Sequence, residues 1–205
     1  IDIDNLQLKN KIDIKLSACH YNHKMRGKES DLDQNFVERL CGDRGVELKV
    51  GSYLGKKTLK SEEEAREARY AFFEKILKED RGAKMALAHN ADDLAETLIF
   101  RLVRGSGTKG LKSIPPRRKN FIRPLLDFEK VDILSYLKYD SLSYRKDSSN
   151  NDLNYNRNLI RYKITPLLKE INPRANINIK NFSEILTKED DFISLTDIAK
   201  KFNDR

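Results

Sequence analysis

Apolar and polar residues follow regular spacings along most of the 205-residue chain, and these spacings predict its secondary structure. In IDIKLSAC, residues 12–19, apolar residues occupy every second position, which is typical of a strand with one buried face. Apolar residues recur at helical spacing after Ser61. Ser61 and Glu64 together predict a capping box at the start of a helix that ends near residue 80. The same criteria predict strands at 46–50 and 84–89, and helices from Ser30 to 42–45, over 91–105 and from Asp127 to Leu137.

Strands that alternate with helices predict an α/β fold, in which a parallel, twisted sheet is flanked by helices on both faces. We expect the strands at 12–19 and 84–89 to be neighbours in the core of this sheet. From Leu159 onward the apolar spacing is helical, with interruptions at Pro166 and Pro173, so we expect a helical C-terminal extension. We therefore predict an α/β domain over residues 1–165 and a helical extension or linker over residues 166–205.

Charge adds a candidate partner to this fold class. The formal net charge is +8 and the sequence pI about 9.3, which favours a polyanionic partner. No apolar run approaches the roughly 20 residues of a membrane span, and the N-terminus lacks the apolar core of a signal peptide. The two cysteines, Cys19 and Cys41, form neither a CxxC pair nor a disulfide framework, so we expect no membrane and a reducing, cytoplasmic setting.

Acidic residues are concentrated at the start of the helix predicted over 91–105. Asp92, Asp93 and Glu96 lie in or near its first turn, at the end of a strand, where ligands bind in open α/β sheets. A helical wheel places the three carboxylates on one side, and the opposite arc holds the residues expected to face the core: Ala95, Leu98, Ile99 and Leu102. Acids in a first turn also offset the helix dipole, and that interpretation stays open for each of them. Because a basic, glycine-containing segment follows, a bound Mg²⁺ or a cationic substrate held near phosphate is the sharper hypothesis.

Five segments in register resemble the tRNA(Ile)-lysidine synthetases, which belong to the PP-loop ATP pyrophosphatase superfamily. The resemblance covers about residues 16–186 and is carried by CHYNHKMRGKESDLDQNFVERLC, EEEAREARYAFFE, HNADDLAETLIFRLVRGSGTKGLKSIPP, RPLLDFEKVDILSYL and RKDSSNNDLNYNRNLIRYKITPLLKEINP. It implies a Rossmann-like PP-loop fold and ATP-dependent ligation of free L-lysine to C2 of the wobble cytidine of tRNA(Ile) with a CAU anticodon. The reaction would pass through an adenylated tRNA and release AMP and pyrophosphate, with ATP and Mg²⁺ as cofactors. A homodimer stays open.

The resemblance also assigns roles to residues that match the family's motifs. The expected ATP site comprises Cys19, His20, Tyr21, Arg66, Arg69, Ala88 and His89. The expected catalytic residues are Asp92, Asp93, Glu96, Arg157 and Arg161, with Mg²⁺ at Asp92 and Asp93. The expected tRNA contacts, whose cations would bind phosphate without reading sequence, are Arg101, Arg104, Lys109, Lys112, Arg117, Arg118 and Lys119. An ordinary solvated surface is the alternative for each of these bases.

One departure qualifies the resemblance. The superfamily's phosphate loop, S-G-G-x-D-S, does not occur among the 205 residues, and its usual place is upstream of IDIKLSACH. Because the other motifs are intact, we expect the natural protein to carry this loop outside the given residues; a degenerate, catalytically inactive RNA-binding domain is the alternative. A PP-loop enzyme of the 2-thiocytidine type is the other alternative, although such enzymes use cysteines that are often paired as CxxC. Asp147, Ser148 and Asn150 match a further family motif, for which anchoring of a polar loop is the competing explanation.

Overall fold

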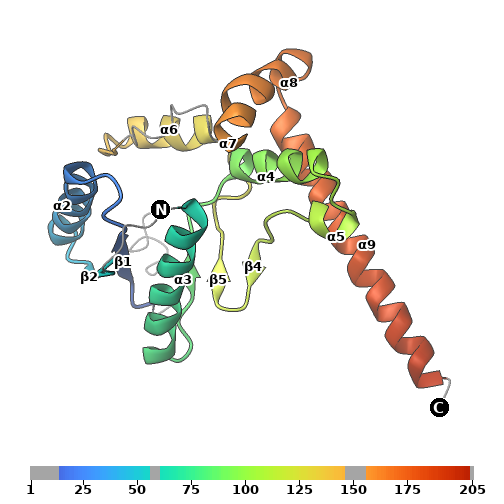
Figure 1. Cartoon of the computed structure of the whole chain (residues 1–205), viewed down its shortest axis with the longest axis horizontal. Coiled ribbons are helices and arrows are strands. Elements are labelled where there is room, and N and C mark those ends of the chain that lie inside the picture. Colours follow the sequence, from blue (N-terminus) through green and yellow to red (C-terminus); the bar gives the residue numbers. More distant parts are fainter. Residues whose placement is uncertain (1–13, 56–60, 146–155, 204–205) are drawn as a thin grey trace. The chain divides into compact units, whose positions relative to one another are not determined.

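The computed structural model describes residues 14–55, 61–145 and 156–203 (Figure 1). Contacts between residues divide the chain into two compact units, residues 1–83 and residues 84–205, called here the first and the second unit. The division at residue 165 that the sequence predicts stays a prediction.

The first unit pairs two parallel strands with two helices. Strand β1 (Ser17–Asn22) lies beside β2 (Glu47–Ser52), in register from Ser17 opposite Glu47 to Asn22 opposite Ser52. Helix α2 (Lys28–Asp43) connects them, and α3 (Glu62–Glu79) packs on β1 through the rings of Tyr21 and Phe72, whose centroids are 5.4 Å apart. A Cβ at Gly51 would lie 2.7 Å from the Phe72 ring, so only glycine allows this approach. Ser61 caps α3, and its Oγ accepts the N–H of Glu64 at 3.1 Å, as predicted.

The second unit holds a small sheet and the remaining helices. Strand β3 (Met85–Ala86) pairs in parallel with β5 (Phe121–Ile122), which pairs antiparallel with β4 (Arg117–Arg118). The helices of this unit are α4 (Ala91–Val103), α5 (Thr108–Leu111), α6 (Lys130–Tyr139), α7 (Asn156–Leu159), the π-helix η2 (Ile160–Ile164), α8 (Thr165–Ile171) and α9 (Ala175–Asn203). The long helix α9 packs along α4 and α5 (Figure 1). The inner face of α4 is formed by buried apolar residues: Ala91, Leu94, Ala95, Leu98 and Ile99.

The predicted α/β class, with parallel strand pairs, flanking helices and a helical C-terminal part, is confirmed. The prediction that the strands at 12–19 and 84–89 are neighbours is wrong for the described residues, because β1 pairs with β2 and β3 with β5 in separate sheets. The strand predicted at 12–19 also begins later, since β1 starts at Ser17, and Ile14 and Leu16 ahead of it are 47 % and 48 % exposed. Hydrophobic periodicity does not indicate which strand lies beside another.

Three predicted helix boundaries also differ from the structure. Ser30 lies inside α2, where its Oγ accepts the N–H of Arg26 at 3.2 Å instead of capping the helix. Asp127 does not begin α6, since Glu129 caps that helix and Asp127 pairs with Lys180. At Pro166 the helix does not stop. Proline lacks an N–H and crowds the preceding turn. That turn is the π-helix η2, and the N–H of Thr165 donates to Ile160 O.

Candidate functional site

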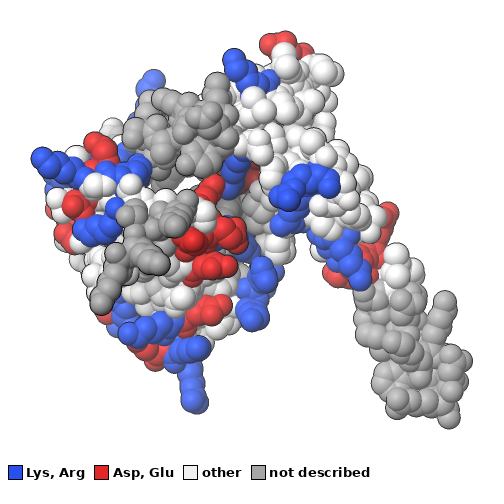
Figure 2. All heavy atoms as spheres, in the orientation of Figure 1, with Lys and Arg blue, Asp and Glu red and all other residues white. Residues whose placement is uncertain are grey.

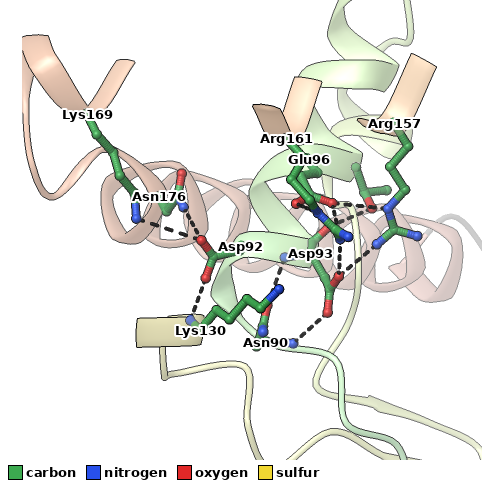
Figure 3. Close-up of polar contacts among 10 residues, drawn as sticks. Asn90, Asp92, Asp93, Glu96, Lys130, Arg157, Arg161, Lys169 and Asn176 are labelled. Atoms are coloured by element: carbon green, nitrogen blue, oxygen red, sulfur yellow. Dashed lines mark hydrogen bonds and ion pairs between the residues drawn. The ribbon is translucent and has the colours of Figure 1, made fainter. Parts of the chain in front are cut away.

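The candidate site begins at the capped start of α4. Asn90 Oδ1 accepts the N–H of Asp93 at 3.0 Å, and Asp93 Oδ2 accepts the N–H of Asn90 at 3.1 Å, which together form a capping box. Asp93 therefore has a local structural role at the start of its own helix, which is to cap it. Only one of its oxygens is used in this way, and Oδ1 projects toward α7 and η2 (Figure 3).

Two arginines one helical turn apart meet Asp93 and Glu96. Arg161 binds Glu96 bidentately, with Nε 2.6 Å from Oε1 and Nη2 2.8 Å from Oε2. Arg157 bridges the acids, with Nε 3.1 Å from Glu96 Oε2 and Nη2 2.9 Å from Asp93 Oδ1. The hydrogen bond with Glu96 is the main reason that the pKa of Arg161 is raised. Four of the predicted catalytic residues thus form one cluster of two acids and two arginines, called here the acid–arginine cluster (Figure 3).

Glu96 is more enclosed than the helical wheel predicts. It is 1 % exposed, although the sequence places it opposite the core-facing arc of α4, and Leu102, predicted to face the core, is 56 % exposed. The wheel describes directions around one helix and not the elements that pack on it. Arg157 and Arg161 cover Glu96 from a segment more than 60 positions away.

Asp92 does not converge with the other two acids. Its Oδ2 accepts the N–H of Lys130 at 2.7 Å, and its Oδ1 accepts Asn176 Nδ2 at 2.8 Å. Adjacent residues on a helix face different directions, and Figure 3 shows Asp92 and Asp93 turned toward different partners. The expected convergence of three carboxylates is therefore correct for Asp93 and Glu96 and wrong for Asp92.

This divergence bears on the Mg²⁺ predicted at Asp92 and Asp93. Among the residues that the structure describes, no group of three or more acidic, histidine or cysteine side chains could hold a metal ion. Each of the two carboxylates already faces donors from the chain itself, and they point to different partners. The two residues therefore do not fit a shared magnesium site.

The seven bases predicted to bind tRNA fall into two groups. Arg101 donates to Gly110 O at 2.8 Å and to Ser113 O at 3.1 Å, which holds α5 against α4, and Lys112 pairs with Asp190 of α9. The exposed group comprises Arg104, Lys109, Arg117, Arg118 and Lys119. Figure 2 shows basic side chains over the end of α4 and over α5, with acidic ones beside them. In the described contacts, no member of the exposed group holds α5 in place as Arg101 and Lys112 do. The guanidinium of Arg104 lies 5.2 Å from the centroid of the Phe100 ring.

The predicted nucleotide residues of the first unit lie on β1 and α3. Cys19, His20 and Tyr21 are half-buried on β1, and Arg66 and Arg69 are half-buried on α3. Burial, followed by the charge of Arg66, lowers the pKa of Arg69, which forms no ion pair with any described residue. Such a half-buried, unpaired guanidinium fits an anionic ligand.

His23 is a residue of this region that the motif-based prediction did not include. Burial, followed in order by the charges of Arg69, His20 and Arg26, lowers its pKa to about 4. Its ring lies against that of Tyr21, with centroids 5.0 Å apart, and its place in the family-like segment HYNH is the sequence signal that could have indicated it.

Ala88 and His89 follow β3 in the second unit, so their part in the ATP site stays a prediction. Asp147, Ser148 and Asn150 lie outside the described residues.

Comparison with known proteins assigns the chain to a family. The PP-loop domain family matches residues 4–168. The chain belongs to the PP-loop family. This PP-loop chain is 40 % identical over 192 residues to the tRNA(Ile)-lysidine synthase of Caldanaerobacter subterraneus subsp. tengcongensis, covering 91 % of the chain and 41 % of the relative. It is 44 % identical over 162 residues to the same-named protein of Porphyromonas gingivalis, covering 76 % of the chain and 36 % of the relative. The PP-loop chain thus spans about two-fifths of the length of these curated relatives.

A solved structure supports the fold of this PP-loop chain. The U34-tRNA thiolase NcsA from Methanococcus maripaludis, with its [4Fe-4S] cluster, superposes with a TM-score of 0.72 over 91 % of the chain and 66 % of the thiolase chain. The two sequences are 18 % identical, so the likeness concerns the fold alone. In the described part of the PP-loop chain, no helix combines the length and the apolar character that a membrane crossing requires.

Proposed function

We propose that this PP-loop chain carries the catalytic portion of a tRNA(Ile)-lysidine synthetase, which uses ATP to join L-lysine to C2 of the wobble cytidine of tRNA(Ile). The observation that carries the proposal is the identity of 40 % and 44 % with two proteins of that name over most of this chain. The acid–arginine cluster supports it, since the reaction needs carboxylates for an ammonium group and cations for phosphate.

Asp93 and Glu96 are the proposed partners of the lysine side chain. An amine attacks only after it loses a proton, and a carboxylate within hydrogen-bond reach is able to accept it. Arg157 and Arg161 cannot serve as bases, because guanidinium groups stay protonated in proteins. Their proposed role is to balance the charge of the two acids until the amine is bound, and then to attract the anionic phosphate beside the reacting cytidine.

ATP is the proposed co-substrate, since its use is typical of the PP-loop family. Cys19, His20 and Tyr21 would line the base, largely through backbone, and Arg66 and Arg69 would contact ribose or phosphate, with Ala88 and His89 as a further wall. The unpaired guanidinium of Arg69 supports this placement. Mg²⁺ would accompany the phosphates of ATP, but Asp92 and Asp93 do not fit it as shared ligands.

The exposed bases on α4, α5 and β4 are the proposed tRNA contacts. Phosphate binding by such residues gives affinity and salt dependence without sequence readout. Arg101 and Lys112 would act indirectly, by holding α5 in place. A cytoplasmic setting is proposed with this substrate. A homodimer is a separate proposal that equilibrium sedimentation tests.

Sulfur transfer is the second candidate activity, because the structural likeness is to a tRNA thiolase. The cysteines argue against it. Burial raises the pKa of Cys19, which makes its thiol a poorer nucleophile, and Cys41 is buried. Neither belongs to a CxxC pair.

One assay separates the candidate functions. The natural gene product that contains this chain is incubated with labelled ATP, L-lysine and a tRNA(Ile) transcript, and AMP release is followed. We expect AMP release that requires both tRNA and lysine. Turnover that requires a sulfur donor would support the thiolating type, and tight tRNA binding without AMP would support an inactive RNA-binding domain.

A further inference from the structure

Asn176 is a buried polar residue that contacts the candidate site from outside all the family-like segments. It is the second residue of α9 and is 0 % exposed. Its Nδ2 donates to Asp92 Oδ1 at 2.8 Å, across 84 positions of sequence (Figure 3). A fully buried amide with a carboxylate partner costs much to remove, so this contact fixes where the end of α9 meets the start of α4.

Asp92 uses its other oxygen to cap a helix that is not its own. Oδ2 accepts the N–H of Lys130, the first residue of α6, at 2.7 Å. Lys169 of α8 lies with Nζ 3.7 Å from Asp92 Oδ1 and 2.7 Å from Glu129 Oε1. Burial disfavours the charged form of Lys169, but the contact with Glu129 and the charges of Asp92 and Glu129 outweigh this and raise its pKa. Asp92 therefore links α4 with α6, α8 and α9, and both of its oxygens face donors of the chain.

We propose that Asp92 and Asn176 are positioning residues of the acid–arginine cluster, and that Asp92 itself binds neither the lysine amine nor a metal ion. The inference rests on the proposed function, because it concerns how Asp93 is held for the amine. Asp92 and Asp93 are neighbours in the first turn of α4, so a contact that fixes the backbone at Asp92 also fixes the direction of Asp93.

Replacement of Asp92 by asparagine or by alanine separates positioning from ligand binding. Asp92→Asn keeps an oxygen for the N–H of Lys130, and its amide can face Asn176 Oδ1, which has no hydrogen-bond partner among the described residues. Asp92→Ala removes both contacts. If Asp92 bound an ammonium group or a metal ion through its charge, both substitutions would weaken that binding alike.

The lysine dependence of AMP release is the first readout. We expect Asp92→Ala and Asn176→Ala to raise the KM for lysine about 10- to 100-fold, the range that loss of a hydrogen bond to a charged group produces. The KM for ATP should stay unchanged, and Asp92→Asn should stay within about threefold of the wild type for lysine. Ser183→Ala is the matched control, since it removes another buried contact of α9, the 2.7 Å hydrogen bond to Lys112 O, away from the site. It should leave the KM for lysine unchanged.

The outcomes decide the inference even when a variant does not fold. If Asp92→Ala or Asn176→Ala is unfolded, Asp92→Asn decides alone: a near-normal KM for lysine supports positioning, and a rise of tenfold or more overturns it. An Asn176→Ala protein that is folded and has a normal KM for lysine also overturns it.

A second readout does not depend on lysine ligation. Hydrogen exchange of the Lys130 amide should accelerate in Asp92→Ala and stay close to wild type in Asp92→Asn, because the amide donates to residue 92. If the wild type fails to ligate lysine, the proposed function is wrong, and this exchange pattern still decides whether Asp92 holds α6. Equal acceleration in both variants would overturn the positioning role.

Discussion

Glu96 places a carboxylate where almost no water reaches it, and Arg157 and Arg161 supply its hydrogen bonds. Glu96→Gln keeps the shape but removes the charge, which leaves two guanidiniums facing a single acid, Asp93. Because the arginines are partly exposed and can be hydrated, we expect a loss of only about 1–3 kcal/mol in unfolding free energy. Turnover should fall about 10²–10⁴-fold, as expected when a general base is lost.

The control for this prediction is Glu189→Gln, which makes the same chemical change at an exposed position of α9. Denaturant unfolding and lysine-dependent AMP release are measured on both variants. A Glu96→Gln protein with near-normal turnover would show that the acid serves the packing of α7 and η2 and not the reaction.

His23 gives the first unit a dependence on pH. Its pKa is about 4 in the folded chain against 6.5 for the free side chain, so the unfolded chain binds more protons between these values. The stability that neutral His23 supports is complete above about pH 6.5 and declines as the pH falls toward 4. We expect the unfolding free energy to decrease over that window, and His23→Gln to reduce the slope. Proton NMR of the ring should show no titration near pH 6.5; a midpoint there would contradict the buried, cation-flanked setting.

At the scale of residues, four members of the cluster can be named from family-like motifs in the sequence. Asp93, Glu96, Arg157 and Arg161 lie in family-like segments, and they meet in the structure. Asn176 could not be found in this way, because a single asparagine in a helix gives no sign that its partner lies 84 positions earlier.

The packing of α9 shows how an element can be predicted correctly while its buried face is not. Three polar residues at seven-residue spacing point toward α4 and the α5 segment: Asn176, Ser183 and Asp190 contact Asp92, Lys112 O and Lys112 Nζ. Seven residues are close to two turns, so the three share one face. Phe182, Ile185, Phe192 and Ile193 are exposed in contrast. Periodicity predicted the helix, but a rule that buries only apolar residues would miss these three polar contacts.

The hairpin of β4 and β5 carries three exposed bases in a row, Arg117, Arg118 and Lys119. If each contacts a tRNA phosphate, replacement of all three by glutamine should lower the slope of log affinity against log salt by about 2–3. The matched control replaces Lys75, Lys78 and Arg81, three exposed bases of the first unit, and so removes the same charge. Filter binding at several salt concentrations measures the slopes. Equal slopes for the two variants would show that the bases of the hairpin form an ordinary solvated surface and do not contact tRNA phosphates.

At the scale of the whole molecule, alternation of strands and helices predicted the α/β class, and the family match and the superposition with a tRNA thiolase agree with it. The pairing of strands could not be predicted. Strand β3 has only two paired residues. Its partner β5 follows the basic segment and pairs with it through only two residues, Phe121 and Ile122. Such short ladders leave too little periodicity to recognise their partners.

The central claim, that this chain belongs to an enzyme that attaches lysine to a cytidine of tRNA(Ile), is tested most directly by following the lysine itself. The natural gene product is incubated with ATP, radiolabelled L-lysine and either of two tRNA(Ile) transcripts, one with cytidine and one with uridine at the wobble position. We predict stable, ATP-dependent labelling of the cytidine transcript alone. Absence of label from the cytidine transcript, or equal labelling of both transcripts, would contradict the claim.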